Sequence, residues 1–232
     1  MRWALVPAKL GADAKRRLAP GLDVAARRAL ARAMLVDVLD ALLRAPSLDG
    51  VAVVGRGTAL AELATAMGAV AFPERRARSL NGAVAEGLRA CTARGATSVL
   101  VAMADLPLLR ARDVESMLAG RSGDAVVAAV SRDGTGTNLL LLHPPRVIST
   151  AFGPGSLELH RAAASRAGVP FVVRSLAGPA LDVDTPSDLA ALRASRTLRG
   201  ETRRAIEAVA ATSSAPSASR NSRGRPSPPS SR

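Results

Sequence analysis

The chain has 232 residues, a formal net charge of +13 and 48% apolar residues, enough for one large domain or two small ones with a substantial core. Aromatic residues make up only 2% and tyrosine is absent, which argues against RNA-binding modules that stack bases on exposed rings. The single cysteine, Cys91, excludes a disulfide framework and a cysteine metal site, and we expect it to be a small buried helix residue.

Short apolar runs alternate with amphipathic segments along the chain, a pattern typical of strands alternating with helices. The expected strands are Trp3–Val6, Val51–Val54, Ala69–Phe72, Ser98–Met103, Ala125–Val130, Thr137–Leu142, Pro170–Leu176 and Leu181–Pro186. The expected helices are Asp23–Ala45, Ala59–Met67, Asn81–Arg94, Arg112–Ala119, Ser156–Ala167 and Ser187–Arg193, with Asp23, Asn81 and Ser156 at N-cap positions. This pattern predicts an α/β fold: a single-domain, mostly parallel mixed sheet with helices on both faces and one hairpin-like insertion over residues 125–142.

The C-terminal part has a different composition. From Arg193 onward, nine arginines and two glutamates contribute +7 of the total +13, and from Thr212 onward serine, proline and arginine dominate. We expect one domain over residues 1–195 and a basic, largely disordered tail over 196–232, although 196–211 could still form a helix. No apolar run reaches the roughly 18 residues of a membrane span and no signal peptide is evident, so a cytoplasmic location is expected.

The only two lysines, Lys9 and Lys15, lie in one short loop behind the first expected strand, whereas the chain has thirty arginines. A lysine ammonium is a compact, flexible point charge suited to phosphate groups. The loop contains neither GxGxxG nor GxxxxGK[ST], so it is not a dinucleotide fingerprint or a P-loop. We expect the two lysines to neutralise a nucleotide triphosphate, and a solvated N-terminal loop is the alternative.

Acidic residues follow two of the apolar runs. Asp105 comes just after the expected strand over residues 98–103. A carboxylate there could hold Mg²⁺ together with phosphate oxygens, or it could cap a turn. Asp182 and Asp184 lie two positions apart on an expected strand, so they point to the same side. Two like charges are costly there unless a cation separates them, which favours a metal role for at least one. Asp188 fits the first turn of a helix.

Two glycine turns could hold a second anion. One is Asp133–Asn138, which is also compatible with a plain hairpin turn, and the other is Phe152–His160, which is also compatible with a plain helix start. His143 and His160 have no metal partner at short spacing and are expected to be structural. Lysines for a triphosphate, separated carboxylates for Mg²⁺ and these turns together favour nucleotidyl transfer, in which an acceptor attacks the α-phosphorus and pyrophosphate leaves.

The order of these motifs resembles a known family. The segments VPAK…AKRRLAP, LNGAV, ADLPLL, DGTGTN, FGPGS…H and DVDTPSDL, all within residues 1–192, are similar to those of the phospholactate guanylyltransferases. The resemblance implies a single-domain nucleotidyltransferase fold related to the GT-A glycosyltransferases. It also implies transfer of GMP from GTP to 2-phospho-L-lactate, phosphoenolpyruvate or 3-phosphoglycerate, a step of coenzyme F-420 biosynthesis.

The resemblance also implies roles for individual residues at the matching positions. One departure concerns Arg16, because family members often have serine directly after the second lysine, so the phosphate contacts there are expected to differ. The C-terminal tail has no counterpart in the family pattern. The implied roles are GTP-phosphate contacts for Lys9 and Lys15, Mg²⁺ ligation for Asp105 and Asp184, phospho-acid binding for Thr137, Gly153 and Ser156, and proximity to the guanine or ribose for Asn81.

Two other functions are compatible with the sequence. One is a related GT-A-like nucleotidyltransferase acting on a sugar phosphate or a molybdopterin, although the signature LxGGxSxRMGxDK of many such enzymes is absent. The other is a basic nucleic-acid-binding protein, favoured by a pI near 11.6. More than half of the excess charge lies in the tail, so nucleic acid is expected to bind nonspecifically at most, through that segment. The sequence leaves open the identity of the acid and whether the protein forms a homodimer.

Overall fold

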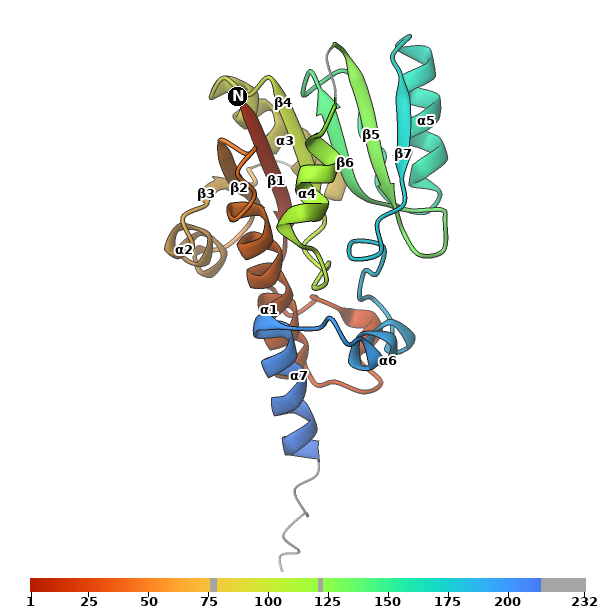
Figure 1. The fold of residues 1–232 in the computed structure, drawn as a ribbon. Coiled ribbons are helices and arrows are strands. Elements are labelled where there is room, and N and C mark those ends of the chain that lie inside the picture. Colours follow the sequence, from red (N-terminus) through yellow and green to blue (C-terminus); the bar gives the residue numbers. More distant parts are fainter. Residues whose placement is uncertain (76–78, 121–122, 214–232) are drawn as a thin grey trace, which may run out of the picture.

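A single seven-stranded sheet forms the centre of the molecule in the computed structural model, which describes residues 1–75, 79–120 and 123–213 (Figure 1). The strand order is β3-β2-β1-β4-β6-β5-β7, in which β6 pairs antiparallel with β4 and β5 and the other pairs are parallel. The α/β, mostly parallel mixed sheet and its hairpin-like insertion are thus confirmed. The strands are β1 (Arg2–Ala8), β2 (Gly50–Gly55), β3 (Val70–Pro73), β4 (Ser98–Ala102), β5 (Ala125–Val130), β6 (Thr137–His143) and β7 (Phe171–Arg174).

Helices cover both faces of this sheet, as expected. Alternate residues of β1 enter two separate apolar cores, Val6 on one face and Leu5 on the other, because successive side chains of a strand point in opposite directions. Cys91 is buried in the second core, as expected. The first core is covered by α1 (Val24–Leu43), α2 (Thr58–Ala66) and α4 (Ala111–Leu118), and the second by α3 (Leu80–Ala93) and α5 (Ser156–Arg166).

The predicted helix caps were right in one case and wrong in two. The Asp23 carboxylate accepts a hydrogen bond from the third residue of α1, as an N-cap should. Asn81 is not the cap of α3, because Ser79 accepts the backbone bond and the Asn81 amide bonds elsewhere. Ser156 is already the first helical residue of α5, and Gly155, in a left-handed conformation, occupies the cap position.

The strand expected over residues 181–186 does not form. This segment makes one backbone bond to the sheet region, from the Val183 N–H to the Asp105 carbonyl at 3.2 Å. The chain then enters α6 (Pro186–Ala194) through a capping box in which Thr185 and Asp188 bond each other's backbone N–H. Asp188 is therefore a first-turn helix residue, as expected, and the single bond brings the acidic segment against the end of β4.

A final helix, α7 (Gly200–Ser213), lies along the N-terminal half of α1 (Figure 1). Ile206 joins a third apolar cluster with Leu30 and Met34 of α1, and the Asp37 carboxylate accepts the backbone N–H groups that open α7. The folded part of the chain therefore continues beyond residue 195, where we expected the domain to end. The disorder expected for the rest of the tail concerns residues outside the described ranges. No helix in those ranges is long and apolar enough to cross a membrane.

Candidate active site

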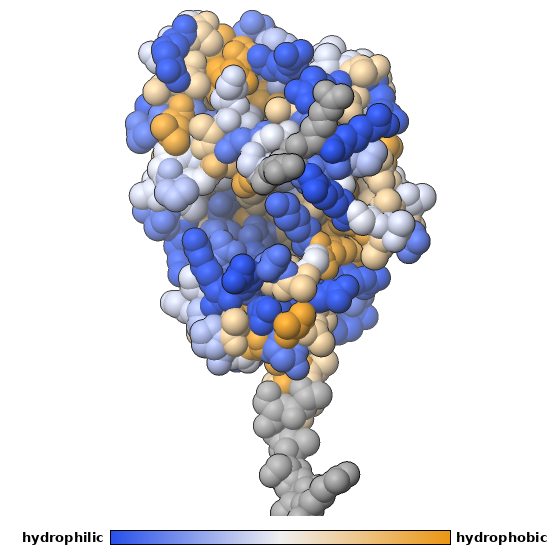
Figure 2. Space-filling model, turned by 180° about the vertical axis from the view of Figure 1, so that it is seen from behind, coloured by the Kyte–Doolittle hydropathy of each residue, from blue (hydrophilic) through white to orange (hydrophobic). Residues whose placement is uncertain are grey.

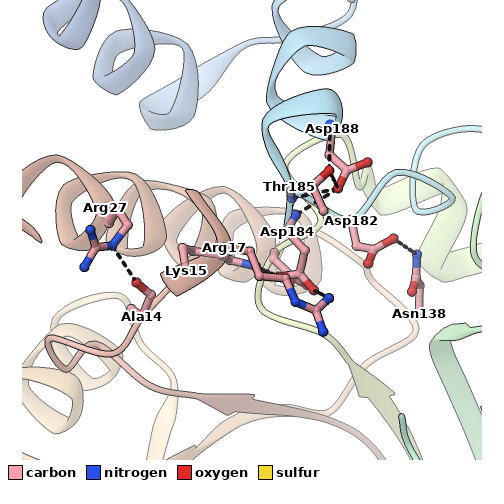
Figure 3. Close-up of polar contacts among 10 residues, drawn as sticks. Ala14, Lys15, Arg17, Arg27, Asn138, Asp182, Asp184, Thr185 and Asp188 are labelled. Carbon is pink, nitrogen blue, oxygen red and sulfur yellow. Dashed lines mark hydrogen bonds and ion pairs between the residues drawn. The ribbon is translucent and has the colours of Figure 1, made fainter. Parts of the chain in front are cut away.

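The lysine loop connects β1 to α1 across the carboxyl ends of the strands. Lys15 has a left-handed backbone (φ 52°, ψ 42°) and precedes a short 3-10 turn over Arg16–Leu18. Arg27 of α1 is buried and fixes the loop, because its guanidinium donates to the carbonyls of Leu22 at 3.0 Å and Ala14 at 3.4 Å (Figure 3). Arg27 thereby ties the loop to the start of α1, and Lys15, directly after Ala14, lies beside the aspartates.

Lys15 joins the two aspartates that the sequence places far apart. Its ammonium group donates to Asp184 Oδ1 at 2.8 Å and also to Asp105 Oδ2, while only 11% of its side chain is exposed. Burial lowers the pKa of Lys15, but the two carboxylates more than offset this effect, so its pKa lies above the ordinary value and the group stays charged. Both carboxylates thus converge on one cation, at the end of β4 and beside α6.

These carboxylates could also hold a divalent cation. Asp105 Oδ1 is buried and has no hydrogen-bond partner among the described residues, so it has an unused ligand position. No cluster of three or more His, Cys, Asp or Glu side chains suited to a metal occurs in that part of the chain. Mg²⁺ needs no such cluster, because it is commonly held by one or two carboxylates with water and phosphate oxygens. The residues present therefore fit a magnesium ion that binds together with a phosphate ligand.

Asp182 is a third carboxylate beside this pair. Its Oδ1 accepts from Asn138 Nδ2 at 3.2 Å (Figure 3). Burial raises the pKa of Asp182 above its usual range, and the charges of Asp105 and Asp184 raise it further. Asp182 and Asp184 line the same cavity wall, although the strand from which we expected them to point to one side does not form. Arg17 also approaches, with Nη1 3.9 Å from Asp184 Oδ2.

Two cavities meet at the aspartates. One, of about 280 Å³, is lined by the lysine loop and includes both Lys9 and Lys15. The other, of about 680 Å³, is lined by the two glycine turns. Figure 2 shows the larger one, from the side of α3 and α5, as a mostly hydrophilic hollow. The residues common to both walls are Leu80, Met103, Asp105 and Asp184.

The first glycine turn is braced by a charged carboxylate. Asp133 accepts hydrogen bonds from the Ser131 hydroxyl at 2.6 Å and from the backbone and hydroxyl of Thr135, both at 3.0 Å. The Ser131 and Thr135 hydrogen bonds lower the pKa of Asp133 to about 2, so it remains ionised at neutral pH. The turn leads directly into β6, whose first residue, Thr137, lies in the wall of the larger cavity.

The second glycine turn presents backbone donors to the same cavity. Gly153 and Gly155 have positive φ angles of 133° and 68°, which other residues rarely adopt. Their N–H groups have no hydrogen-bond partner within the described ranges, whereas the N–H of Ser156 bonds to the Gly153 carbonyl. Free N–H groups at the start of an eleven-residue helix, α5, form a setting that favours anions.

Two side chains hold this turn from behind. The Asn81 amide exchanges two hydrogen bonds with the backbone of Phe152, at 2.9 and 2.7 Å. His160 Nε2 lies 2.9 Å from the backbone nitrogen of Ala151, and its Nδ1 lies 3.1 Å from Thr137 Oγ1. The Asn81 amide thus holds the turn, its expected place near the guanine or ribose stays a prediction, and His160 contacts two parts of the site instead of only filling the core.

The structure separates the predicted residues into two sets on either side of the aspartates. Lys9 and Lys15 line the smaller cavity, and the residues expected to bind the phospho-acid, Thr137, Gly153 and Ser156, line the larger one. The contact between His160 and Thr137 was not predicted. It joins α5 to β6, so no local spacing in the sequence signals it.

Solved structures similar to this chain define its fold class. One is a protein from Desulfovibrio desulfuricans G20, with a TM-score of 0.70, 18% identity and coverage of 90% of this chain and 95% of that one. Another is a nucleotidyl transferase from Methanothermobacter thermautotroptrophicus, with a TM-score of 0.62 and 18% identity. The match covers 83% of this chain and 96% of that one. The chain therefore has a nucleotidyltransferase fold.

Sequence relatives narrow this class to a family. The family model described as guanylyl transferase CofC like matches residues 2–225. A phosphoenolpyruvate guanylyltransferase from Rubrobacter xylanophilus is 40% identical over 205 residues, covering 88% of this chain and 98% of the relative. A 3-phospho-D-glycerate guanylyltransferase from Phenylobacterium zucineum is 38% identical over 192 residues, covering 81% and 88%. The chain belongs to the CofC-like guanylyl transferase family.

Proposed function

We propose that this protein transfers GMP from GTP to a small phosphorylated three-carbon acid and releases pyrophosphate. The observation that carries the proposal is the meeting of a lysine-lined cavity and a donor-rich cavity at Asp105 and Asp184. The family and the names of the relatives support a guanylyl group and a phospho-acid acceptor. Reaction between two bound anions needs such an arrangement, because positioning and charge neutralisation provide most of the catalysis.

On the donor side, the lysine loop would bind the GTP triphosphate. Lys9 and Lys15 would neutralise the phosphate oxygens, and Lys15 is already beside the carboxylates that define the reacting end of the cavity. Asp105 and Asp184 would hold Mg²⁺, which when bound supplies charge neutralisation for the phosphates and the leaving pyrophosphate. The nucleoside would extend away from the acceptor cavity, since the aspartates separate the two.

On the acceptor side, the glycine turns would bind the acid. The N–H groups of Gly153 and Gly155 and the hydroxyls of Thr137 and Ser156 provide hydrogen-bond donors, and Arg17 adds positive charge at the cavity wall. A phosphate oxygen of the acid would attack the α-phosphorus of GTP. The bond from that phosphorus to the bridging oxygen breaks, and this oxygen leaves with pyrophosphate. The product is the acid joined to GMP through a phosphoanhydride.

The acceptor would be 2-phospho-L-lactate, phosphoenolpyruvate or 3-phosphoglycerate, and the product would enter coenzyme F-420 biosynthesis. The relatives named for phosphoenolpyruvate and 3-phospho-D-glycerate support the second and third acids. The three acids share a phosphate and a carboxylate on a three-carbon frame, which suits a cavity of about 680 Å³ rich in donors. They differ by a pair of hydrogens or by a hydroxyl group.

The test is to incubate the purified protein with GTP, Mg²⁺ and each acid separately, and to measure pyrophosphate and the product mass. We expect pyrophosphate release and a mass equal to the acid joined to GMP with at least one acid. ATP and CTP in place of GTP, and a sugar phosphate in place of the acids, are the matched controls. Product from the sugar phosphate alone, or from no acid at all, would overturn the proposal.

A further inference from the structure

His160 of α5 touches two parts of the acceptor cavity wall through its two ring nitrogens. Nε2 lies 2.9 Å from the Ala151 backbone nitrogen, and Nδ1 lies 3.1 Å from Thr137 Oγ1. The side chain is completely buried, and the Phe152 ring packs against it edge to face at a centroid distance of 4.9 Å. These contacts give the imidazole one orientation in the folded protein.

The contact with Ala151 decides which ring nitrogen carries hydrogen. A backbone N–H can only donate, so Nε2 must accept and cannot itself be protonated. Burial lowers the pKa of His160 to about 4, so the ring is neutral at neutral pH. A neutral imidazole has one N–H, which therefore lies on Nδ1 and donates to the Thr137 hydroxyl oxygen.

From this geometry we infer that His160 is a positioning residue, which makes the Thr137 hydroxyl a dedicated donor to an oxyanion of the acceptor acid. Because Oγ1 accepts from Nδ1–H, its own hydrogen must point away from the imidazole. Thr137 lies in the wall of the larger cavity, and no other partner of its hydroxyl occurs among the described residues. The inference rests on the proposed acceptor site and adds a residue that does not itself touch the acid.

The hydrogen-bond donors near the Thr137 hydroxyl explain why a hydroxyl with a fixed donor direction suits this cavity. The N–H groups of Gly153 and Gly155 can only donate, so a hydroxyl that also donates completes a set of one kind. Carboxylate and phosphate oxygens only accept, and such a set fits them. A freely rotating hydroxyl would satisfy a donor or an acceptor and would discriminate less between an acid and a neutral analogue.

Two replacements of His160 separate its contacts. In His160→Gln the longer amide can still accept from the Ala151 N–H but does not reach Thr137. In His160→Asn the shorter amide takes the place of Nδ1 and can still donate to Thr137. We expect the Gln variant to raise KM for the acid about tenfold with KM for GTP within about twofold of wild type, and the Asn variant to recover most of that loss. Equal effects on both KM values, or no recovery in the Asn variant, would overturn the inference.

A double replacement tests whether His160 acts through Thr137. In a Thr137→Val background, His160→Gln should cause no further rise in KM for the acid, because the hydroxyl that it orients is gone. Additive effects would overturn the role. The ¹⁵N chemical shifts of the His160 ring in the wild-type protein should show hydrogen on Nδ1, and hydrogen on Nε2 would contradict the inference regardless of activity. If the wild type forms no product from any acid, the proposed function itself fails. This outcome is distinct from the outcomes above, which overturn only the role of His160.

Discussion

The donor and acceptor sides of the site are held in different ways. On the donor side, Lys9 is exposed and has no hydrogen bond or ion pair within the described residues, and the Lys15 side chain is fixed only by the two aspartates. On the acceptor side, Asp133, Asn81 and His160 each fix a turn through two or more hydrogen bonds. The turns of the larger cavity are thus held by their side chains, whereas on the other side Arg27 holds the loop backbone and Lys9 is left without a partner among the described residues.

This contrast follows from what each substrate can contribute. The proposed triphosphate brings several charges, which can draw the exposed Lys9 into place and exchange with the aspartates as partners of Lys15. A three-carbon acid offers few contacts, so most of its recognition has to be built into the protein in advance. The contrast predicts that changes at the aspartates stop turnover, changes on the acceptor side affect the acid, and changes in the loop affect GTP.

The largest effect is expected at the junction of the two cavities. Asp105→Asn and Asp184→Asn should each lower kcat by at least about 100-fold, because each removes a charge that would hold the proposed Mg²⁺. Steady-state pyrophosphate release measures this loss, and circular dichroism checks that the fold is retained. Asp40→Asn, at an exposed ion pair with Arg44, is the matched control and should stay within about twofold. Near-normal turnover in either site variant would remove that aspartate from the metal site.

The second effect concerns stability against pH on the acceptor side. The pKa of His160 is lowered from 6.5 to about 4 in the folded protein, so the unfolded chain takes up the proton first as the pH falls. The contribution of this group to the free energy of unfolding is fully present above about pH 6.5. It is lost between there and pH 4, and the loss amounts to about 3 kcal/mol.

Urea unfolding at several pH values measures this dependence. In His160→Asn the slope over the same range should become shallower, because the titrating group is absent. The wild-type and Asn curves are compared at equal ionic strength. If the stability of the variant falls equally steeply, the pH dependence belongs to other groups. The neutral, buried state that the contacts of His160 require would then be contradicted.

A smaller effect is expected from the lysine loop. Lys9→Ala and Lys15→Ala should mainly raise KM for GTP, by about tenfold, with little change in KM for the acid. Arg166→Ala, at the exposed end of α5, is the matched removal of a positive charge away from both cavities. An unchanged GTP dependence in both lysine variants would mean that this loop is only a solvated connection.

The smallest effect is expected from removing residues 214–232. Truncation after Ser213 should leave turnover and the unfolding temperature unchanged and reduce nonspecific DNA binding, since it removes four arginines and no acidic residue. Truncation after Ser195 should behave differently, because it uncovers Leu30 and Met34 of α1 and costs at least about 2 kcal/mol of stability. Equal behaviour of the two truncations would mean that α7 adds nothing to the fold.

Much of the fold could be predicted because the apolar runs are short, regular and separated by helix signals. The prediction of a strand over residues 181–186 was wrong. Periodicity cannot show that, in this segment, Val183 alone makes a backbone hydrogen bond to the segment after β4. The N-cap of α5 was placed at Ser156 but lies at Gly155, which has a left-handed backbone. The sequence pattern does not show which of these two neighbouring residues caps the helix.

The candidate site could be predicted in part for a related reason. Asp105 follows the apolar strand β4, which places it at the carboxyl edge of the sheet, and the backbone bond from Val183 to Asp105 brings Asp184 to the same place. The engagement of Asn81 with Phe152, and of His160 with Thr137, depends on tertiary contacts between separate elements. Such contacts leave no local pattern, so His160 was assigned only a structural part, and the place expected for Asn81 near the guanine or ribose stays a prediction.

The most direct test of the account follows the acceptor phosphate itself. The central claim is that an oxygen of this phosphate attacks the α-phosphorus of GTP where the two cavities meet. With phosphoenolpyruvate or 3-phosphoglycerate carrying ¹⁸O in all phosphate oxygens, mass spectrometry should find the whole label in the guanylylated product and none in pyrophosphate. Label in pyrophosphate, or a guanylylated product that lacks the labelled phosphate, would contradict the account.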